Sequence, residues 1–280
     1  MSSSPEQHLS AVKKIALFGL GEAGSLIAND LVKSGVAVTA YDPKDVATPD
    51  GVIRVQNPRQ AVVGAEVIIA LTAGDDAYTA LTQAIEDIPS STLYADFSTN
   101  SPSAKLRMAE QALQSGFDFV DVALMTVVPG KGLKTPVTIA GCGARRFEQL
   151  LSPLDMPITR LEGEAGAAAT RKLLRSVMMK GLAAVIIESM RAAEAADCSE
   201  WLWHNLCNEI THADQQLITR LVIGTEPHAQ RRLHEMECSS ELLKALNIDP
   251  TMTQATVESL RSVIDKGIPT IPSGQDKKIL

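Results

Sequence analysis

The sequence predicts an α/β protein in which a doubly wound parallel sheet is followed by an all-α C-terminal domain. Short, almost continuously apolar runs alternate with helical patterns through the N-terminal part, which is typical of parallel strands covered by helices. After Glu162 the strand patterns stop and only helical patterns follow. The first apolar run ends in a glycine-rich segment that opens a helix, Gly19-Leu20-Gly21-Glu22-Ala23-Gly24.

This glycine segment follows the apolar run 15–18, and its helical pattern continues to about Ser34. A strand that breaks at glycines into a helix is the setting in which GxGxxG binds a dinucleotide. Gly19 allows a tight turn, Gly21 lets the backbone approach a pyrophosphate, and Gly24 lets helix and strand pack closely. The pyrophosphate would lie on the free N–H groups of the helix N-terminus. We therefore expect a Rossmann-type domain with the whole segment at the cofactor. The alternative is an ordinary glycine-rich turn.

The second apolar run, 36–41, ends at Asp42, which lies 18 residues after Gly24. This is close to the roughly 20-residue spacing at which an acid accepts hydrogen bonds from the adenosine ribose. A carboxylate there favours NAD and repels the 2′-phosphate of NADP, whereas Lys44 could pair with that phosphate. We expect NAD or NADP as the cofactor, with NAD favoured by Asp42. The alternative role of Asp42 is that of a turn residue before Pro43.

Further strands are expected near 52–55, at 67–71 and at 92–96, with helices at 75–85 and 103–115. The runs 119–123 and 137–140 extend the sheet. Ligands of such sheets bind beyond the carboxyl ends of the strands. Two polar segments follow strands in this way, 71–74 and 96–100. We expect Thr72 and Ala73, in the first of them, to contact the cofactor.

The C-terminal part is predicted to begin with an alanine-rich, proline-free helix from Ala167 to about Ala196, longer than an average helix. It is apolar on much of its circumference, so we expect it to be covered on several sides, including by a second subunit in a homodimer. Helices are also expected at 201–221, 227–246 and 253–265. The chain thus divides into a disordered tail (1–11), a dinucleotide-binding Rossmann domain (12–162), a helical substrate and dimerisation domain (163–267) and a loose tail (268–280).

Composition argues against several classes of function. The net charge is −7 and there is no basic block, so we expect no binding to nucleic acid or to an anionic membrane surface. No apolar run reaches the roughly 18 residues that suggest a membrane span. Four cysteines are scattered without CxxC spacing, which predicts no metal site and reduced thiols in a cytoplasmic protein. The N-terminus lacks the pattern of a secretion signal.

Lys172 lies six residues after Gly166, just inside the long helical run. Lys172 and Ser176 are one turn apart and share a face. Small neighbours such as Ala169 favour burial, and desolvation lowers the pKa of a lysine toward the value that a general acid–base needs. A lysine that exchanges a proton with a substrate oxygen while hydride moves to or from a nicotinamide would support alcohol–carbonyl interconversion. The alternative is a solvated helix face with ordinary surface cations.

The order of these motifs resembles that of the β-hydroxyacid dehydrogenase family, which includes 3-hydroxyisobutyrate dehydrogenase and 6-phosphogluconate dehydrogenase. The resemblance covers nearly the whole chain. The C-terminal half looks most like a branch with a 6-phosphogluconate dehydrogenase-like helical domain. The segments that carry it are GLGEAG (19–24), DFSTNSP (96–102), FVDVALM (119–125), RKLLRSVMMKGL (171–182) and HAQRRLHEME (228–237).

This resemblance implies that Lys172 is the catalytic lysine and that Ser98 and Thr99 contact the substrate. The chain departs from the family at two positions. The usual asparagine one turn after the lysine is Ser176, whose hydroxyl can still form a hydrogen bond but reaches less far. The Ser-Gly-Gly substrate loop is replaced by residues 124–130, with Thr126 as the candidate contact. We therefore expect a substrate that differs from the family's small hydroxyacids.

Arg231 is a further candidate for substrate binding, because a guanidinium can bind a carboxylate or phosphate through two parallel hydrogen bonds. It shares a broad helix face with His228, Arg232 and Glu235. The alternative, which the rarity of buried charge favours, is an exposed face with an Arg–Glu pair.

The leading hypothesis is an NAD(P)-dependent oxidoreductase that interconverts a secondary alcohol and a carbonyl on a small, β-hydroxy acid-like substrate, with Lys172 as the general acid–base. One alternative is an imine or enamine reductase on the same scaffold. The other is a dinucleotide-binding sensor without catalytic activity, which the missing asparagine and the altered loop leave open.

Overall fold

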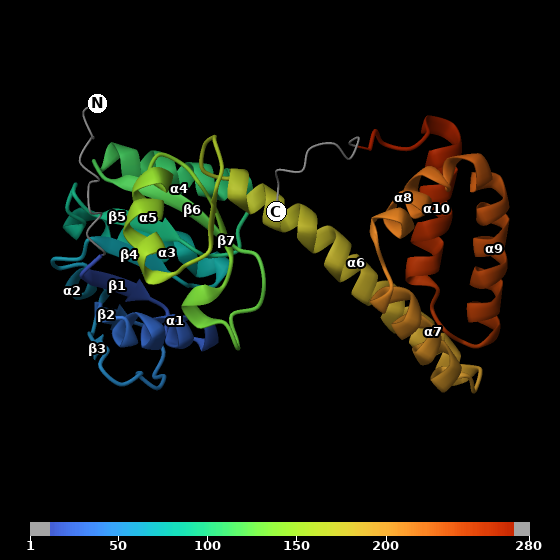
Figure 1. The fold of residues 1–280 in the computed structure, drawn as a ribbon, viewed down its shortest axis with the longest axis horizontal. Helices are drawn as coiled ribbons and strands as arrows, with labels where there is room; N and C mark the ends of the chain where they lie inside the picture. Colours follow the sequence, from blue (N-terminus) through green and yellow to red (C-terminus); the bar gives the residue numbers. More distant parts are fainter. Residues whose placement is uncertain (1–11, 272–280) are drawn as a thin grey trace, which may run out of the picture. The chain divides into compact units, whose positions relative to one another are not determined.

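The structure is a computed structural model, and it describes residues 12–271 (Figure 1). The tail expected at 1–11 and most of the one expected at 268–280 lie outside the described residues. The chain divides into two compact units between Arg175 and Ser176, inside the long helix that begins at Ala167. This division lies within a helix and does not test the domain boundary expected after Glu162, which stays a prediction.

The first unit contains one eight-stranded sheet in the order β3-β2-β1-β4-β5-β6-β7-β8. The predicted doubly wound parallel sheet is confirmed, with one antiparallel pair, β6 and β7. These two strands are joined by residues 125–136, which contain only a short 3-10 helix, η2 (Gly132–Lys134), instead of a crossover helix. The strands are β1 (Lys14–Phe18), β2 (Ala37–Tyr41), β3 (Ile53–Arg54), β4 (Val67–Ala70), β5 (Leu93–Asp96), β6 (Asp118–Leu124), β7 (Val137–Ala140) and β8 (Ile158–Arg160).

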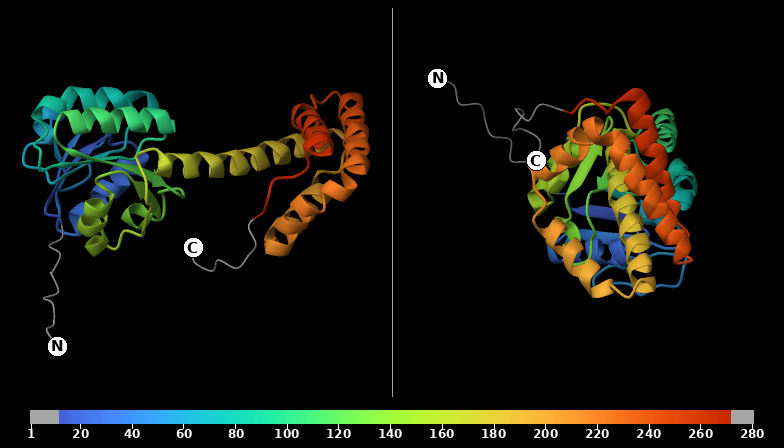
Figure 2. Two further views of the ribbon diagram at one scale, coloured as in Figure 1. Left: turned by 90° about the horizontal axis from the view of Figure 1, so that it is seen from above. Right: turned by 90° about the vertical axis from the view of Figure 1, so that its right-hand side faces the viewer.

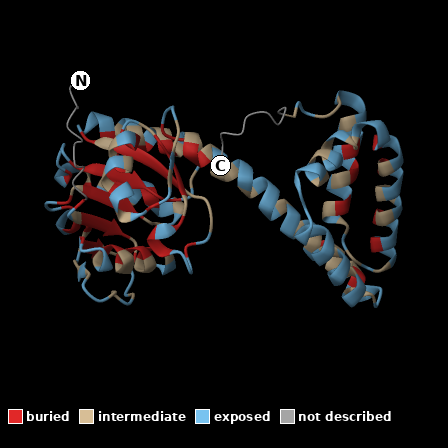
Figure 3. Cartoon of the chain, in the orientation of Figure 1, coloured by how far each residue is buried: buried red, intermediate tan, exposed pale blue. Residues whose placement is uncertain are grey.

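Helices cover both faces of this sheet, and alternation along each strand divides the core between them (Figure 2). Ile15 and Leu17 of β1 belong to the cluster under α1 and α5, whereas Ala16 and Phe18 belong to the cluster under α2, α3 and α4. Buried residues accordingly run along the central strands (Figure 3). These helices are α1 (Glu22–Lys33), α2 (Pro58–Ala61), α3 (Gly74–Ala84), α4 (Pro102–Gln114) and α5 (Ala144–Leu151).

The helical unit is built from α7 (Ser199–Thr211), α8 (Gln215–Ile223), α9 (Ala229–Ala245), α10 (Thr251–Lys266) and the later part of α6 (Ala167–Ala195). The long helix α6 agrees with the prediction, but the single helix expected at 201–221 is wrong. It is two helices, because Asp214 breaks the run and caps α8 by accepting the N–H of Leu217 at 2.8 Å. Within the described residues, no helix is long and apolar enough to cross a membrane.

Candidate functional site

Glycine occupies the three motif positions for different structural reasons. Gly19 has φ +96°, and a Cβ there would lie 2.5 Å from the carbonyl oxygen of Leu71. A Cβ on Gly24 would lie 2.0 Å from the carbonyl oxygen of Gly19, so the helix can approach the turn only without a side chain. At Gly21 a Cβ would meet no atom within 4 Å. Gly19 and Gly24 are therefore needed for the turn itself, while Gly21 leaves open space beside the N-terminus of α1, where a pyrophosphate can approach.

A groove of about 540 Å³ lies at the carboxyl ends of β1, β2 and β4, where the strand order reverses. This is where ligands bind in such sheets. Thr72 Oγ1 is buried and forms no hydrogen bond with any described residue, so it can serve a bound molecule. The groove brings together five of the nine expected cofactor residues; Leu20, Glu22, Ala23 and Gly24 do not line it. Those that do are Gly19, Gly21, Asp42, Thr72 and Ala73.

Asp42 has the turn role that the sequence left open, and it also lines the groove. One carboxylate oxygen accepts the N–H of Lys44 at 2.8 Å, which forms the turn around Pro43, and the other accepts the N–H of Leu20 at 2.7 Å. The Arg54 guanidinium donates to the carbonyl oxygens of residues 42, 44 and 46 and fixes this loop. Asp42 and Lys44 both line the groove, so a carboxylate and an ammonium group lie where the adenosine ribose is expected.

A narrow crevice lies beside the ends of β5 and β6 and the first turns of α6. Lys172 is half-buried and lines it together with Ser98 and Thr99, so three expected substrate-side residues meet at one place. The remaining lining residues are Asn100, Asp121, Val122, Ala123, Ala169 and Leu173.

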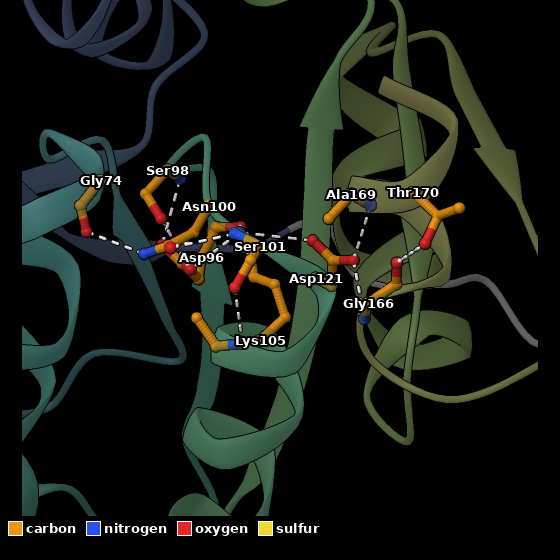
Figure 4. Close-up of polar contacts among 11 residues, drawn as sticks. Gly74, Asp96, Ser98, Asn100, Ser101, Lys105, Asp121, Gly166, Ala169 and Thr170 are labelled. Atoms are coloured by element: carbon orange, nitrogen blue, oxygen red, sulfur yellow. Dashed lines mark hydrogen bonds and ion pairs between the residues drawn. The ribbon is translucent and has the colours of Figure 1, made fainter. Parts of the chain in front are cut away.

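A side-chain hydrogen bond and a close backbone approach join the loops of the crevice and the groove. Asn100 Nδ2 donates to the carbonyl oxygen of Gly74 at 2.8 Å (Figure 4). A Cβ on Gly74 would lie 2.5 Å from the carbonyl oxygen of Thr99, so the loop after β4 packs directly on the loop after β5. The loops that line the groove and the crevice are therefore held against each other.

A buried ionic network that the sequence analysis missed lies beneath the crevice (Figure 4). Lys105 on α4 is fully buried, and its Nζ lies 2.8 Å from Asp96 Oδ2 and 3.3 Å from Asp121 Oδ1. It also donates to the carbonyl oxygen of Asp96 at 2.9 Å. Charged residues at apolar strand and helix positions were the available signal, because such charges are almost never buried without partners.

The other three expected substrate residues do not line this crevice. Thr126 donates to the carbonyl oxygen of Val127 and accepts from Lys131 Nζ, both at 3.0 Å. Ser176 lies one turn after Lys172 on α6, just past the division between the units. Arg231 is exposed in the helical unit, 3.6 Å from Glu235, which matches the alternative of a charged helix face.

The loop that carries Thr126 is attached to the cofactor helix. Asp30 Oδ2 on α1 accepts the N–H of Leu133 at 2.9 Å, and Gly132, with φ +52°, has no room for a Cβ beside the same oxygen. Among the described residues, no group of three or more His, Cys, Asp or Glu side chains could hold a metal ion.

Comparisons with known proteins agree with this architecture. The family model described as the NAD binding domain of 6-phosphogluconate dehydrogenase matches residues 14–158, just over half of the chain. A second model, a domain of unknown function (DUF1932), matches residues 193–263. The 2-(hydroxymethyl)glutarate dehydrogenase of Eubacterium barkeri is 25% identical over 177 residues, which are 59% of this chain and 58% of that protein. The match thus spans less than two thirds of that relative.

Solved structures show the same fold. A reductive aminase from Aspergillus terreus in complex with NADPH and ethyl levulinate is 15% identical, with a TM-score of 0.76 over 92% of this chain and 95% of that one. An imine reductase variant from Myxococcus stipitatus in complex with NAD+ is 14% identical, with a TM-score of 0.76 and the same two coverages. The resemblance inferred from the motifs is confirmed by the family match: the chain belongs to the β-hydroxyacid dehydrogenase-like family, with the NAD-binding domain of 6-phosphogluconate dehydrogenase.

Proposed function

We propose that the protein transfers a hydride between NAD(P) and the secondary alcohol or carbonyl carbon of a small, β-hydroxy acid-like substrate. The observation that carries the proposal is the crevice in which Lys172, Ser98 and Thr99 meet, adjoining the loop that lines the cofactor groove. The nicotinamide supplies or accepts the hydride. The protein residues bind and orient the substrate and exchange its proton.

In this proposal Lys172 Nζ is the general acid–base. In the reductive direction it donates a proton to the substrate oxygen as the carbonyl becomes an alcohol, and in the oxidative direction it removes that proton. Lys172 is half-buried and lines the crevice together with the small Ala169. Ser98 and Thr99 hold the substrate, with Thr126 as a further candidate for a contact to it.

A panel of substrates and one pair of lysine variants test the proposal. The panel contains β-hydroxy acids, the matching carbonyl acids and cyclic imines, each measured with NADH and NADPH or their oxidised forms. Lys172→Met is expected to lower kcat by about 100-fold or more while cofactor affinity is unchanged. Lys180→Met, an exposed lysine two turns further along α6, is the matched control and keeps wild-type turnover. Wild-type turnover in Lys172→Met would refute the role of this lysine.

The same panel separates the alternatives. The fold shared with imine reductases and a reductive aminase supports an imine or enamine reductase as the second candidate. Reduction of cyclic imines without turnover of alcohols would favour it. Tight cofactor binding without turnover of any compound would favour a dinucleotide-binding sensor.

For the cofactor we propose a preference for NAD. The support is the Asp42 carboxylate in the groove, which repels a 2′-phosphate, although Lys44 lies in the same groove. In Asp42→Asn the dissociation constant of NADPH is expected to fall toward that of NADH. A wild-type protein that binds NADPH more tightly would contradict this preference.

We also propose a cytoplasmic homodimer formed through the helical unit. Its support is the large number of exposed apolar side chains on α6, α7 and α8, among them Val177, Trp201 and Ile218. All four cysteines are free, which fits a reducing compartment.

A further inference from the structure

Asp121, in the middle of β6, caps the start of α6 from outside the helix. Its Oδ2 accepts the N–H groups of Gly166 and Ala169, both at 2.9 Å (Figure 4). The backbone also packs closely there, because Gly166 has φ +99° and a Cβ on it would lie 2.8 Å from the carbonyl oxygen of Pro102. Lys172 follows Ala169 by three residues. The carboxylate of Asp121 therefore sets the position of the first turn of α6, which directly precedes Lys172.

Asp96, at the end of β5, holds Ser98 in the same way. Its Oδ1 accepts the N–H of Ser98 at 3.1 Å, and its Oδ2 accepts the Ser98 hydroxyl at 2.9 Å. Because the hydroxyl proton is donated to a carboxylate, Ser98 can meet a ligand only as a hydrogen-bond acceptor. It thus fits a substrate O–H or N–H group and does not fit a substrate carboxylate.

Lys105 joins these two carboxylates. Its ammonium has three oxygen partners, two on Asp96 and one on Asp121, and its side chain is almost completely inaccessible to water. Asp121 Oδ1 forms no hydrogen bond within the described part of the chain, so its contact with Lys105 is the ion pair alone. Without the ammonium, two buried carboxylates would lose the positive charge that lies between them.

We propose that Lys105 is a positioning residue of the candidate site. By holding Asp96 and Asp121 in place, it fixes Ser98 as an acceptor and fixes the first turn of α6, directly before Lys172. Lys105 does not line the crevice, so it acts only through these two carboxylates. This inference rests on the proposed function for its catalytic consequence but not for its structural one.

Four variants of the full-length protein test the proposal: Lys105→Met, Asp121→Ala, Asp121→Asn and Leu151→Ala. The first two remove the ammonium and the cap. Asp121→Asn retains an oxygen that can accept both N–H groups. Leu151 is fully buried on α5 and contributes to the core without touching the network, so Leu151→Ala is the control for a loss of stability alone.

The first measurement is amide hydrogen exchange of the peptide that spans residues 165–174. Exchange is expected to accelerate by about tenfold or more in Lys105→Met and Asp121→Ala, since the first turn of α6 loses its anchor. It should stay near wild type in Asp121→Asn and in Leu151→Ala. Unchanged exchange in Asp121→Ala, or equal acceleration in Leu151→Ala, would overturn the proposal. If Lys105→Met does not fold, the comparison of Asp121→Ala with Asp121→Asn tests the proposal.

The second measurement separates positioning from cofactor binding. With the most active compound of the panel, kcat is expected to fall by roughly 100-fold in Lys105→Met and Asp121→Ala, the loss typical of a displaced catalytic group. The dissociation constant of NADH, measured by its fluorescence, is expected to remain that of the wild type. Equal losses of kcat and NADH affinity would contradict a positioning role. If the wild type turns over no compound, the proposed function fails while the exchange experiment still decides the positioning claim.

Discussion

Gly21 and Gly24 lie three positions apart in one motif, yet their substitution should have opposite consequences. The Cβ of Gly21→Ala meets no protein atom within 4 Å, so the fold should tolerate it. We expect its free energy of unfolding to change by less than about 1 kcal/mol. The same methyl group occupies the space where the pyrophosphate approaches, so NADH affinity should fall by about tenfold or more. Chemical denaturation and fluorescence titration measure the two quantities.

Gly24→Ala is the matched comparison. Its methyl group would overlap the carbonyl oxygen of Gly19, and both atoms lie on backbone that cannot yield without moving helix α1. We expect a loss of about 2 kcal/mol or more in the free energy of unfolding, as for an overpacked core. Equal stabilities of the two alanine variants would show that the turn relaxes, and the separate roles of the glycines would then be wrong.

Tyr94 carries a hydroxyl that the fold does not use. The side chain is fully buried beside Phe18, Phe117 and Phe119, and its Oη forms no hydrogen bond with any described residue. Tyr94→Phe removes a desolvated polar group and keeps the ring packing. We expect the free energy of unfolding to rise by about 1 kcal/mol at neutral pH. A loss of stability in this variant would mean that the hydroxyl has a partner.

The same residue predicts a dependence on alkaline pH. Burial, with the negative charge of Asp96 as a smaller cause, raises the pKa of Tyr94 well above its usual value of 10.0. Above about pH 10 the unfolded chain therefore loses the tyrosine proton while the folded protein keeps it, so stability falls as pH rises. Below pH 10 the contribution is fully present. Comparison of wild type and Tyr94→Phe in denaturant titrations between pH 9 and 11 isolates this slope, which the variant should lack.

At the scale of single residues, the sequence predicted the roles that a local motif defines. The three glycines and Asp42 could be interpreted from spacing because a βα turn is formed by neighbours in the chain. Lys105, Asp96 and Asp121 could not, since their roles depend on α4, β5 and β6 meeting in space. A charged residue at a buried position is visible in the sequence only as an exception to a pattern, and the pattern does not name its partner.

Among the helices, α10 begins without a side-chain cap of its own, and α6 supplies one. Glu188 is buried on α6, and its carboxylate accepts the N–H groups of Met252 and Thr253 and the Thr253 hydroxyl at 2.6 to 2.8 Å. Glu188→Gln keeps the shape but removes the charge that strengthens these bonds. We expect it to lower the free energy of unfolding of the helical unit by about 1–2 kcal/mol, and Glu188→Ala by more. Circular dichroism during denaturation measures both.

The free energy of unfolding at acidic pH should also depend on this cap. Burial raises the pKa of Glu188, but hydrogen bonds from the Thr253 hydroxyl and from the two N–H groups together lower it below its usual value of 4.5. The unfolded chain therefore binds a proton more readily than the folded protein as pH falls through this region. The stabilisation is present above about pH 4.5 and is lost below it. The free energy of unfolding of Glu188→Gln should fall less steeply than that of the wild type as pH decreases through this range. The same pH dependence in both proteins would contradict the role of Glu188 as a cap.

The boundaries of helices and strands agree with the predicted ones where a single local signal in the sequence determines them. Helix α6 starts after Gly166 and lacks proline, so its length was visible, and α3 and α4 lie within a residue or two of their predicted ranges. The break between α7 and α8 was missed because Asp214 acts as a cap within a continuous helical pattern. Strand β8 was also missed. It is three residues long and pairs only with β7, so its pattern is too short to distinguish from a loop.

At the scale of the whole molecule, apolar exposure is distributed unevenly. The first unit buries its strands under helices on both faces, whereas α6, α7 and α8 present large apolar side chains to solvent. Val177 is 74% exposed and Ile218 is 62% exposed. Many exposed large apolar side chains on neighbouring elements of the chain are the usual mark of a site of association. The proposed occupant is the same surface of a second copy, because most oligomers of soluble proteins are symmetric homo-oligomers.

The proposed dimer predicts a sedimentation mass of twice 29.9 kDa. Val177→Glu and Ile218→Glu place charge on residues that a single chain leaves exposed, so they should cost little in the fold and yet shift the mass toward that of one chain. Leu113→Glu and Val63→Glu are matched controls, 72% and 65% exposed on the first unit, and should leave the mass unchanged. A wild type that sediments as one chain at micromolar concentration would refute the dimer. A mass halved equally by Leu113→Glu would instead assign the association to the first unit.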